Sequence, residues 1–297
     1  MIWLVGNKGM LGRELELLLK EKSIDFVGTD KEVSITDLNT LYQFSDSLTK
    51  KNKKIRWIIN CAAYTMVDKA EDETSLCYEI NVFGPQNLTK LACELDASLI
   101  HISTDYVFSG DTDCPYSEEN PKAPCCVYGS SKSEGEDLVL SLCKNSLIIR
   151  TAWLYGRYGH NFVYTMLKLM NQKDHLNVVD DQVGSPTWTK DLANVIITII
   201  SKAEIHYGVY HYTNEGQCSW FEFSKEIYRL GVTYGIIKNQ CEIRPIKTSE
   251  YKTKAKRPLY SVLSKEKIKK VYGIDIPHWK LSLQKFLEEI KRDGEVF

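Results

Sequence analysis

The feature that most constrains the fold is an alternation of short apolar runs and helical patterns through the first half of the chain. Ile2 to Val5 has the composition of a strand that ends at Gly6, and leucines then recur on one helical face from Leu11 to Leu19. Repeated strand–helix units of this length predict a parallel sheet covered by helices on both faces. The other elements expected here are strands at Asp25–Thr29, Trp57–Ile59, Leu99–Ile102 and Leu147–Ile149 and a helix marked by Leu88, Leu91, Ala92 and Leu95.

The pattern becomes less regular beyond about residue 150. The predicted fold class is α/β: a Rossmann-type, doubly wound parallel sheet with a smaller, discontinuous substrate-binding domain over the carboxyl edge, where such sheets bind ligands. We expect residues 1–150 to form the dinucleotide-binding domain, joined by a later segment near 186–212, and residues 151–297 to form mainly the substrate-binding domain. The later elements expected are helices at Phe162–Met170, Leu192–Ile200, Trp220–Leu230 and Leu281–Ile290 and strands at Leu176–Val179 and Val209–Tyr212.

Composition excludes several classes of protein. The 38 basic and 39 acidic residues nearly balance, so the chain lacks the electrostatic signature of a nucleic-acid-binding protein. The first apolar residues are interrupted at Gly6, and the apolar run Val195–Ile200 is too short to span a bilayer, so we expect a cytoplasmic protein without a membrane partner. None of the nine cysteines forms a C-x-x-C pair, which argues against a zinc site or a disulfide framework.

The first strand leads into a glycine turn. Gly6, Gly9 and Gly12 form a G-x-x-G-x-x-G pattern between the strand and the following helix. Glycines let the backbone approach a pyrophosphate closely, and the N–H groups of the helix N-terminus point at its oxygens. The turn and its position predict a dinucleotide cofactor, NADPH or NADH.

Two further stretches can be explained either as cofactor-binding residues or as residues with a purely structural role. Asp30 ends the second strand, where a carboxylate can accept hydrogen bonds from the adenine ribose, although an ordinary turn aspartate fits equally well. Lys31 beside it would tolerate a 2′-phosphate, which leaves NADH and NADPH both open. The small residues after the third strand, Asn60 to Thr65, would let a cofactor lie against the backbone, or would simply pack well.

Tyr128 and Lys132 form the pair that points most directly to chemistry. They are four residues apart, so on a helix they share one face. A tyrosine has a pKa near 10 and transfers protons poorly at neutral pH, whereas a neighbouring ammonium favours the phenolate and lowers the pKa. Because Tyr-x-x-x-Lys also occurs by chance, the pair needs support from its surroundings.

The segment after the Leu99–Ile102 strand supplies that support. Ser103 to Phe108 places hydroxyls and a carboxylate at the carboxyl edge of the predicted sheet, beside Ile102 and the nicotinamide end of a bound cofactor. Thr104 can hydrogen-bond the reacting oxygen and orient Tyr128. Without Tyr128 and Lys132 the segment would be read as an ordinary turn.

With these residues in place, the chain resembles the dTDP-4-dehydrorhamnose reductase family of extended short-chain dehydrogenase/reductases. The resemblance implies NAD(P)H-dependent reduction of the C4 ketone of dTDP-4-dehydro-L-rhamnose to dTDP-L-rhamnose. Several ordered motifs together are far more specific than any one of them. Besides the glycine turn, the matching segments are Asn60–Glu71, Ser103–Gly110, Tyr128–Lys132, Arg150–Tyr155, Asp181–Thr187 and Arg257–Leu263.

The resemblance also implies roles for individual residues. Tyr128 would be the proton donor, and Lys132 would bind the nicotinamide ribose and tune Tyr128. Substrate contacts would come from Thr104, Asp105 and Trp153, and Arg257 would reach the diphosphate, because a guanidinium suits phosphate oxygens. Without the family, Trp153 reads as a core aromatic residue and Arg257 as a surface arginine. The cofactor contacts implied or read from the motifs are Gly6, Gly9, Met10, Leu11, Gly12, Asp30, Asp37, Leu38, Ala62, Ala63, Tyr64, Thr65, Ile102, Tyr128 and Lys132.

The chain departs from the family pattern at one place. Some members are described as dimers joined through magnesium that glutamates hold, and Glu14 matches the first such position. Lys190 stands where the second acid would be, although Asp191 is adjacent. The departure argues against bound Mg²⁺, so no metal ligands are assigned. A homodimer of this chain would then lack the magnesium that joins the two subunits.

Two alternatives remain at the level of sequence. The chain could be another nucleotide-sugar reductase or an epimerase on the same scaffold, which would use the same cofactor and Tyr128. It could also be a non-catalytic subunit, because the regulatory subunit of methionine adenosyltransferase resembles this family. Net consumption of NAD(P)H with a keto-sugar distinguishes the three: an epimerase shows no net consumption, and a regulatory subunit shows no turnover.

Overall fold

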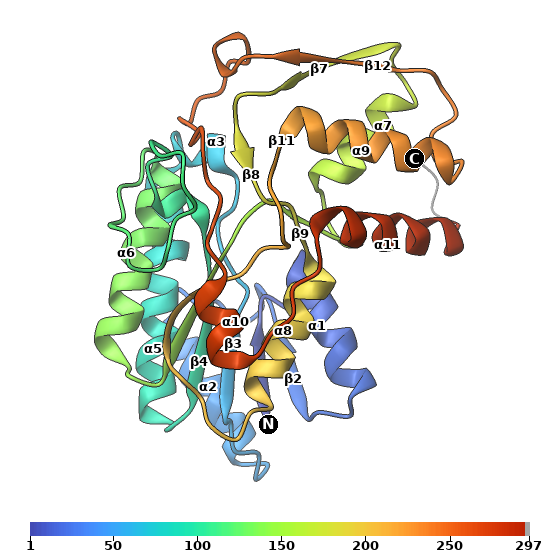
Figure 1. Cartoon of the computed structure of the whole chain (residues 1–297). Helices are drawn as coiled ribbons and strands as arrows, with labels where there is room; N and C mark the ends of the chain where they lie inside the picture. The colour runs from blue at the N-terminus through green and yellow to red at the C-terminus, as the bar shows by residue number, and fades with distance from the viewer. Residues whose placement is uncertain (295–297) are drawn as a thin grey trace.

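The computed structural model describes residues 1–294 and centres on a six-stranded sheet (Figure 1). The strands lie in the order β10-β5-β4-β3-β1-β2, and every neighbouring pair is parallel. The order reverses between β1 and β3, which is the place where doubly wound sheets bind their ligands. The strands are β1 (Ile2–Val5), β2 (Phe26–Thr29), β3 (Trp57–Asn60), β4 (Ser98–Thr104), β5 (Ser146–Thr151) and β10 (Gly208–His211).

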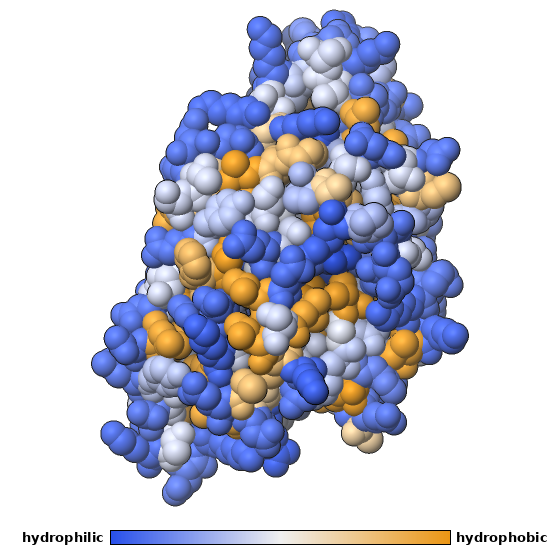
Figure 2. All heavy atoms as spheres, turned by 90° about the vertical axis from the view of Figure 1, so that its left-hand side faces the viewer, coloured by the Kyte–Doolittle hydropathy of each residue, from blue (hydrophilic) through white to orange (hydrophobic). Residues whose placement is uncertain are grey.

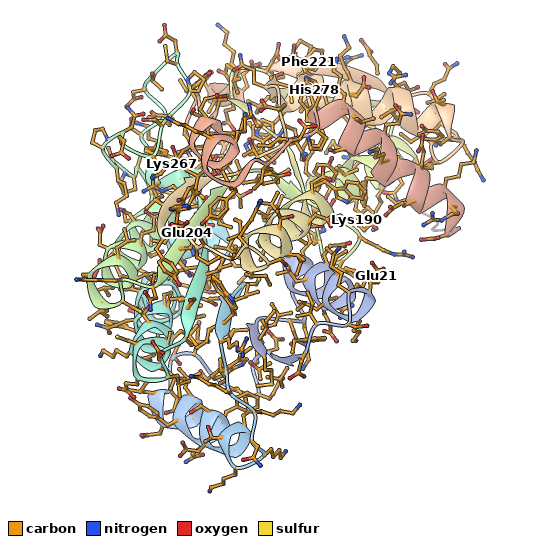
Figure 3. The ribbon with its side chains drawn as sticks, turned by 60° about the horizontal axis from the view of Figure 1, so that its bottom comes forward. Glu21, Lys190, Glu204, Phe221, Lys267 and His278 are labelled. Carbon is orange, nitrogen blue, oxygen red and sulfur yellow. The ribbon has the colours of Figure 1, made fainter. Side chains whose placement is uncertain are left out.

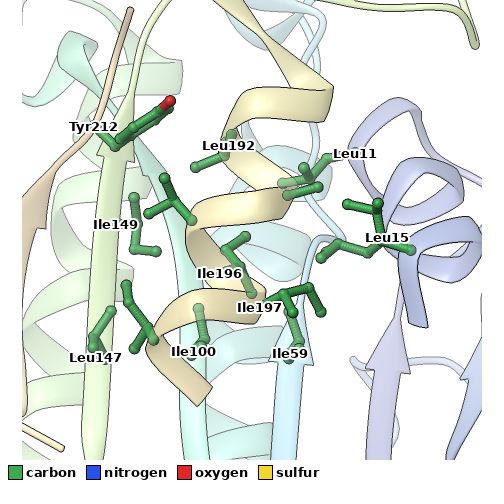
Figure 4. Packing of buried hydrophobic residues seen from close by; sticks show 14 of the residues in the cluster. Leu11, Leu15, Ile59, Ile100, Leu147, Ile149, Leu192, Ile196, Ile197 and Tyr212 are labelled. Atoms are coloured by element: carbon green, nitrogen blue, oxygen red, sulfur yellow. The ribbon is translucent and has the colours of Figure 1, made fainter. Parts of the chain in front are cut away.

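Alternate residues of these strands face two different cores, because successive side chains in a strand point to opposite faces. Ile59, Ile100 and their neighbours on one face pack against α1 (Met10–Glu21) and α8 (Thr189–Ile200), as Figure 4 shows. Trp3 and its counterparts face the other core, which is covered by α2 (Leu38–Thr49), α5 (Gly84–Glu94) and α6 (Val127–Leu142). The sheet is therefore apolar on both sides, as a doubly wound fold requires.

The second half of the chain builds a separate core above the carboxyl edge of the sheet (Figure 1). Its main helices are α7 (Phe162–Met170), α9 (Trp220–Thr233) and α11 (Trp279–Arg292). Three two-stranded sheets complete it: β7 (His175–Val179) with β12 (Glu242–Ile246), β6 (Leu154–Tyr155) with β9 (Thr187–Trp188), and β8 (Val183–Gly184) with β11 (Cys218–Ser219).

Short helices complete the connections between these elements. One of them, α10, packs against β10 of the large sheet. A π-helical turn, η1, leads from α4 directly into α5. The short elements are α3 (Val67–Ala70), α4 (Thr74–Tyr78), η1 (Glu79–Phe83), η2 (Asp105–Val107), η3 (Thr248–Glu250) and α10 (Glu266–Tyr272).

The structure confirms the predicted α/β class with its parallel sheet and adds elements that the sequence pattern did not reveal. The helix α2 was not predicted, because only Leu41, Ser45 and Leu48 of its residues are buried and they give a weak periodic pattern. The strand β12 was also missed, since the alternation of Glu242–Ile246 is weak and a proline interrupts it. The division into domains stays a prediction. None of the helices in residues 1–294 is long and apolar enough to cross a membrane.

Candidate active site

The glycine turn brings three segments into close contact at the point where the sheet order reverses. Gly6 has φ +76°, a conformation that side chains rarely adopt, and a Cβ on it would lie 2.7 Å from the backbone nitrogen of Ala62. A Cβ on Gly12 would lie 2.1 Å from the carbonyl oxygen of Gly6. Gly9 caps α1 without a side-chain hydrogen bond, so the N-terminus of this helix remains available to an anion. The turn therefore fits the diphosphate of a dinucleotide.

A cavity of about 370 Å³ extends from this turn toward the end of β2. Asp30 is half-buried and lies in its wall beside Lys31. The residues after β2 line this cavity as far as Thr36. Asp37, expected near the adenine, instead caps α2 by accepting hydrogen bonds from the backbone N–H groups of Asn39 and Thr40. Leu38 packs against the core on the α2 side of the sheet.

A second cavity, of about 480 Å³, joins the glycine turn to the predicted catalytic residues; we call it the active-site cavity. The structure thus brings together residues from the first turn, from the ends of β3 and β4, and from α6. Gly6 and Ala62 line the neighbouring cavity at the end of β2. The predicted residues in the wall of the active-site cavity are Gly9, Met10, Leu11, Ala63, Thr65, Ile102, Thr104, Asp105, Tyr128, Lys132, Trp153 and Arg257.

Two of the predicted cofactor residues lie behind the cavities. Gly12 is inside α1, where it permits the close packing of the turn. Tyr64 is 4% exposed, and its hydroxyl donates a hydrogen bond of 2.5 Å to the carboxylate of Glu73. Neither residue is among those that line the two cavities.

Tyr128 and Lys132 lie in the first turns of α6 and face the active-site cavity. The helix begins at this place because Cys126 caps it, accepting a hydrogen bond from the N–H of Gly129. A Cβ on Gly129 would lie 2.3 Å from the carbonyl oxygen of Tyr106, so the glycine allows the helix to pack closely on the segment after β4. The Nζ of Lys132 donates a hydrogen bond of 2.7 Å to the carbonyl oxygen of Ile102.

The pKa of Tyr128 differs from the sequence-based expectation. We expected Lys132 to lower it, but burial raises the pKa of the phenol above its ordinary value, and a hydrogen bond with Thr104 only partly opposes this effect. The lysine does not compensate because its Nζ is engaged with Ile102 and His101. Tyr128 is therefore held as a neutral phenol, the form that can donate a proton.

Asp105 is a buried carboxyl group beside Thr104. The hydroxyl of Thr104 donates a hydrogen bond of 3.0 Å to Asp105 Oδ1. Burial raises the pKa of Asp105 to about 6, and hydrogen bonds from Ser261 and Thr104 oppose the rise. The carboxyl group can thus gain or lose a proton near neutral pH while it remains in the wall of the active-site cavity.

Arg257 reaches the active-site cavity from the second half of the chain. Its guanidinium donates hydrogen bonds to Asp68 Oδ2 (2.7 Å) and to the hydroxyl of Tyr106 (3.2 Å). Its Nε is buried without a protein partner. The side chain is therefore fixed in the wall of the active-site cavity.

Trp153 lies opposite, in a conformation that is unusual for a bulky residue. Its φ is +48°, and its ring stacks on Trp220 with the centroids 3.5 Å apart. A Cβ on Gly184 would lie 2.6 Å from the indole, so the glycine makes room for this stack. Backbone strain of this kind persists where the surroundings enforce it and is common at functional sites.

Sequence reasoning missed several residues of the cavity wall. Val67 lies within the Asn60–Glu71 segment that was recognised, so the motif itself could have suggested it. His160 and Trp220 come from the less regular second half, where no local pattern marks them. Figure 2 shows the face that carries α6, with apolar residues gathered across its middle between mostly hydrophilic ends.

The positions that resembled a metal site are engaged with protein groups. Lys190 on α8, labelled in Figure 3, forms an ion pair of 2.7 Å with Glu289, and burial raises the pKa of nearby Glu14. Asp191 accepts hydrogen bonds from Ser282 (2.5 Å) and Asn214 (2.7 Å). Within residues 1–294, no group of three or more His, Cys, Asp or Glu side chains is placed to hold a metal ion. The homodimer stays a prediction.

Comparison with known proteins places this site in a family. The profile described as "RmlD substrate binding domain" matches residues 1–292. A dTDP-4-dehydrorhamnose reductase of Aggregatibacter actinomycetemcomitans is 40% identical over 291 residues, which are 95% of this chain and 96% of the relative. This chain belongs to the dTDP-4-dehydrorhamnose reductase family.

Solved structures of the dTDP-4-dehydrorhamnose reductase family agree over nearly the whole chain. The Clostridium acetobutylicum structure is 40% identical with a TM-score of 0.90, and it covers 98% of this chain and 99% of its own. The Bacillus anthracis structure, described as a complex with NADP, is 38% identical with a TM-score of 0.88 and covers 97% and 98%. Family membership therefore extends over both halves that enclose the cavity.

Proposed function

We propose that this chain is an NAD(P)H-dependent reductase that converts dTDP-4-dehydro-L-rhamnose to dTDP-L-rhamnose by reducing the C4 ketone. The observation that carries the proposal is the active-site cavity, which joins the helix N-terminus at Gly9 to Tyr128, Lys132 and Thr104. A dinucleotide site next to a proton donor is what carbonyl reduction requires. The names of the family relatives support the choice of sugar nucleotide.

The cofactor site is formed by the first turn and the ends of β2 and β3. Gly9, Met10 and Leu11 would hold the diphosphate at the N-terminus of α1, while Asp30 would face the adenine ribose. Lys132 would lie against the nicotinamide ribose at the other end. When bound there, NADPH or NADH supplies the hydride for the ketone.

The protein residues orient the ketone and provide its proton. The Tyr128 hydroxyl, hydrogen-bonded with Thr104, would donate its proton to the carbonyl oxygen as the C4 atom is reduced. Thr104 and Asp105 would fix the sugar, Trp153 would cover its apolar side, and Arg257 would bind the diphosphate. Binding of the remote diphosphate and base would orient the ketone, so the free keto-sugar should react poorly.

A turnover assay tests the proposal. The purified chain is incubated with dTDP-4-dehydro-L-rhamnose and NADPH, the loss of NADPH absorbance is followed, and the product is identified by NMR. We expect one NADPH consumed per dTDP-L-rhamnose formed, with little reaction of the free keto-sugar. Sugar interconversion without net NADPH loss would indicate an epimerase, and the absence of any turnover would favour a regulatory subunit; either result would refute the proposal.

A further inference from the structure

A row of three buried polar side chains continues from Lys132 into the sheet. Asn60 ends β3, His101 lies in the middle of β4, and Lys132 faces them from α6; their exposed fractions are 1%, 0% and 1%. Asn60 Nδ2 lies 3.0 Å from His101 Nδ1, and His101 Nε2 lies 3.1 Å from Lys132 Nζ. The proposed reduction uses only the lysine, so the two residues behind it require an explanation.

The orientation of the Asn60 amide is fixed by the backbone. The N–H of Ala62 donates a hydrogen bond of 3.0 Å to Asn60 Oδ1. A backbone N–H can only donate, so a flipped amide would place two donors against each other. Asn60 Nδ2 therefore faces His101, and because an amide nitrogen only donates, His101 Nδ1 must be the acceptor.

This assignment fixes the tautomer of His101. Burial holds the pKa of His101 well below its ordinary value, so the ring is neutral. A neutral imidazole whose Nδ1 accepts carries its hydrogen on Nε2. The Nε2–H group points at Lys132 Nζ, and an ammonium has no lone pair with which to accept it. A neutral amine can accept this bond and still donate to the carbonyl oxygen of Ile102 at 2.7 Å.

We propose that Asn60 and His101 stabilise the neutral amine form of Lys132 in the cofactor-free protein, which makes His101 a positioning residue for Lys132. The consequence for catalysis rests on the proposed function: His101 fixes the Nζ of Lys132 beside the carbonyl oxygen of Ile102, at the place where the lysine would bind the nicotinamide ribose.

The other groups around Lys132 are consistent with this assignment. Burial lowers the pKa of Lys132 to about 8, while Glu136 on α6, Cys77 on α4 and Cys61 after β3 raise it. The carboxylate of Glu136 is already bound by Arg150 through hydrogen bonds of 2.9 and 2.7 Å. The strongest nearby negative charge is thus shared with another cation, which leaves burial and His101 to favour the amine.

The direct test is NMR spectroscopy of the cofactor-free wild-type protein. The ¹⁵N shifts and couplings of His101 report which ring nitrogen is protonated, and ¹³C-labelled lysine reports the titration of Lys132, assigned by its loss in Lys132→Arg. We expect a hydrogen on Nε2 and a lysine that titrates at least two pH units below the ordinary value for lysine. A hydrogen on Nδ1, or titration of Lys132 near its ordinary value, would overturn the proposal whether or not the sugar is a substrate.

An isosteric substitution reverses the direction of the hydrogen bonds. In Asn60→Asp, one carboxylate oxygen still accepts from Ala62, and the other now accepts from His101 Nδ1–H, so that Nε2 becomes an acceptor for the lysine ammonium. Lys132 should therefore lose its proton at a pH roughly one unit higher than in the wild-type protein. We expect this shift both in the NMR titration and in the pH profile of kcat.

The control is His175→Gln, which alters a histidine of β7 outside the active-site cavity. It should leave the titration of Lys132 and the pH profile unchanged. An unmoved titration in a folded Asn60→Asp protein, or an equal shift in the control, would contradict the proposal. If Asn60→Asp does not fold, the tautomer of His101 in the wild-type protein still tests the proposal.

Discussion

At the scale of single residues, we propose that Tyr128 donates the proton. We expect Tyr128→Phe to lower turnover at least about 100-fold, because general acid catalysis typically contributes that much and phenylalanine removes only the hydroxyl. Cofactor affinity, measured by NADPH fluorescence, should change little, because the ring stays in the cavity wall. Turnover within a few-fold of wild type would show that another group donates the proton.

The raised pKa of Asp105 predicts a pH-dependent contribution to stability. Its value of about 6 in the folded chain, against an ordinary value of 3.8, means that the folded state binds the proton more tightly. The stabilisation is complete below the ordinary value and is lost as the pH rises through about 6, amounting to at most about 3 kcal/mol. Asp105→Asn should therefore gain stability relative to wild type between about pH 4 and about pH 7 in denaturant titrations. A difference independent of pH would contradict the raised pKa.

Asp30 and Lys31 lie side by side in the wall of the cavity near β2 and predict opposite cofactor effects. Asp30→Ala should reduce kcat/KM with NADH roughly tenfold and with NADPH less, because the carboxylate binds a ribose diol but repels a 2′-phosphate. Lys31→Ala is the complementary variant and should reduce the efficiency with NADPH more. Equal losses with both cofactors in each variant would mean that neither residue distinguishes a 2′-hydroxyl from a 2′-phosphate.

The sequence alone was sufficient to find the candidate site residues that lie in local motifs. Tyr128 and Lys132 were found from their spacing, and Thr104 from its place after a strand, because parallel strands bring their carboxyl ends to one edge. His101 could not be found in this way: it reads as one residue of an apolar strand, and its partners are 41 and 31 residues away. The neutral state of Tyr128 was also missed, because its cause is burial.

At the scale of elements, the short strand β8 controls the position of Trp153 through Gly184. A Cβ at this position would meet the indole at 2.6 Å. Gly184→Ala should therefore displace the stacked rings of Trp153 and Trp220 and raise KM for the sugar nucleotide about tenfold, in line with the cost of overpacking. Affinity for NADPH should stay unchanged because the glycine turn is remote. A variant with altered cofactor affinity and unaltered KM would contradict this role for Trp153.

Elements with a strong periodic pattern were predicted well. The helix expected at Phe162–Met170 has those bounds in the structure, and the β4 and β5 strands were located from their apolar runs. The helix α2 was missed because its buried face is narrow and its exposed face is polar. Short strands such as β8 and β11 form only two residue pairs each, so tertiary contacts rather than local sequence define them.

At the scale of the whole molecule, the active-site cavity depends on both halves of the chain. The first half supplies the cofactor turn and Tyr128, while Trp153, Trp220 and Arg257 come from beyond residue 150. The sequence predicted that the second half would lie over the carboxyl edge of the sheet, and the family resemblance named Trp153 and Arg257, but Trp220 was not found. Trp153 and Trp220 are brought to the site by packing around the second core, whereas hydrogen bonds to Asp68 and Tyr106 hold Arg257 there.

The central claim is that this cavity transfers a hydride from the cofactor to C4 of a dTDP-linked keto-sugar. The most direct measurement uses NADPH carrying deuterium at the transferable position, with dTDP-4-dehydro-L-rhamnose as substrate and NMR analysis of the product. We predict dTDP-L-rhamnose with one deuterium at C4 and one NADP⁺ formed per sugar. Recovery of unlabelled product, or label at any other carbon, would contradict the account.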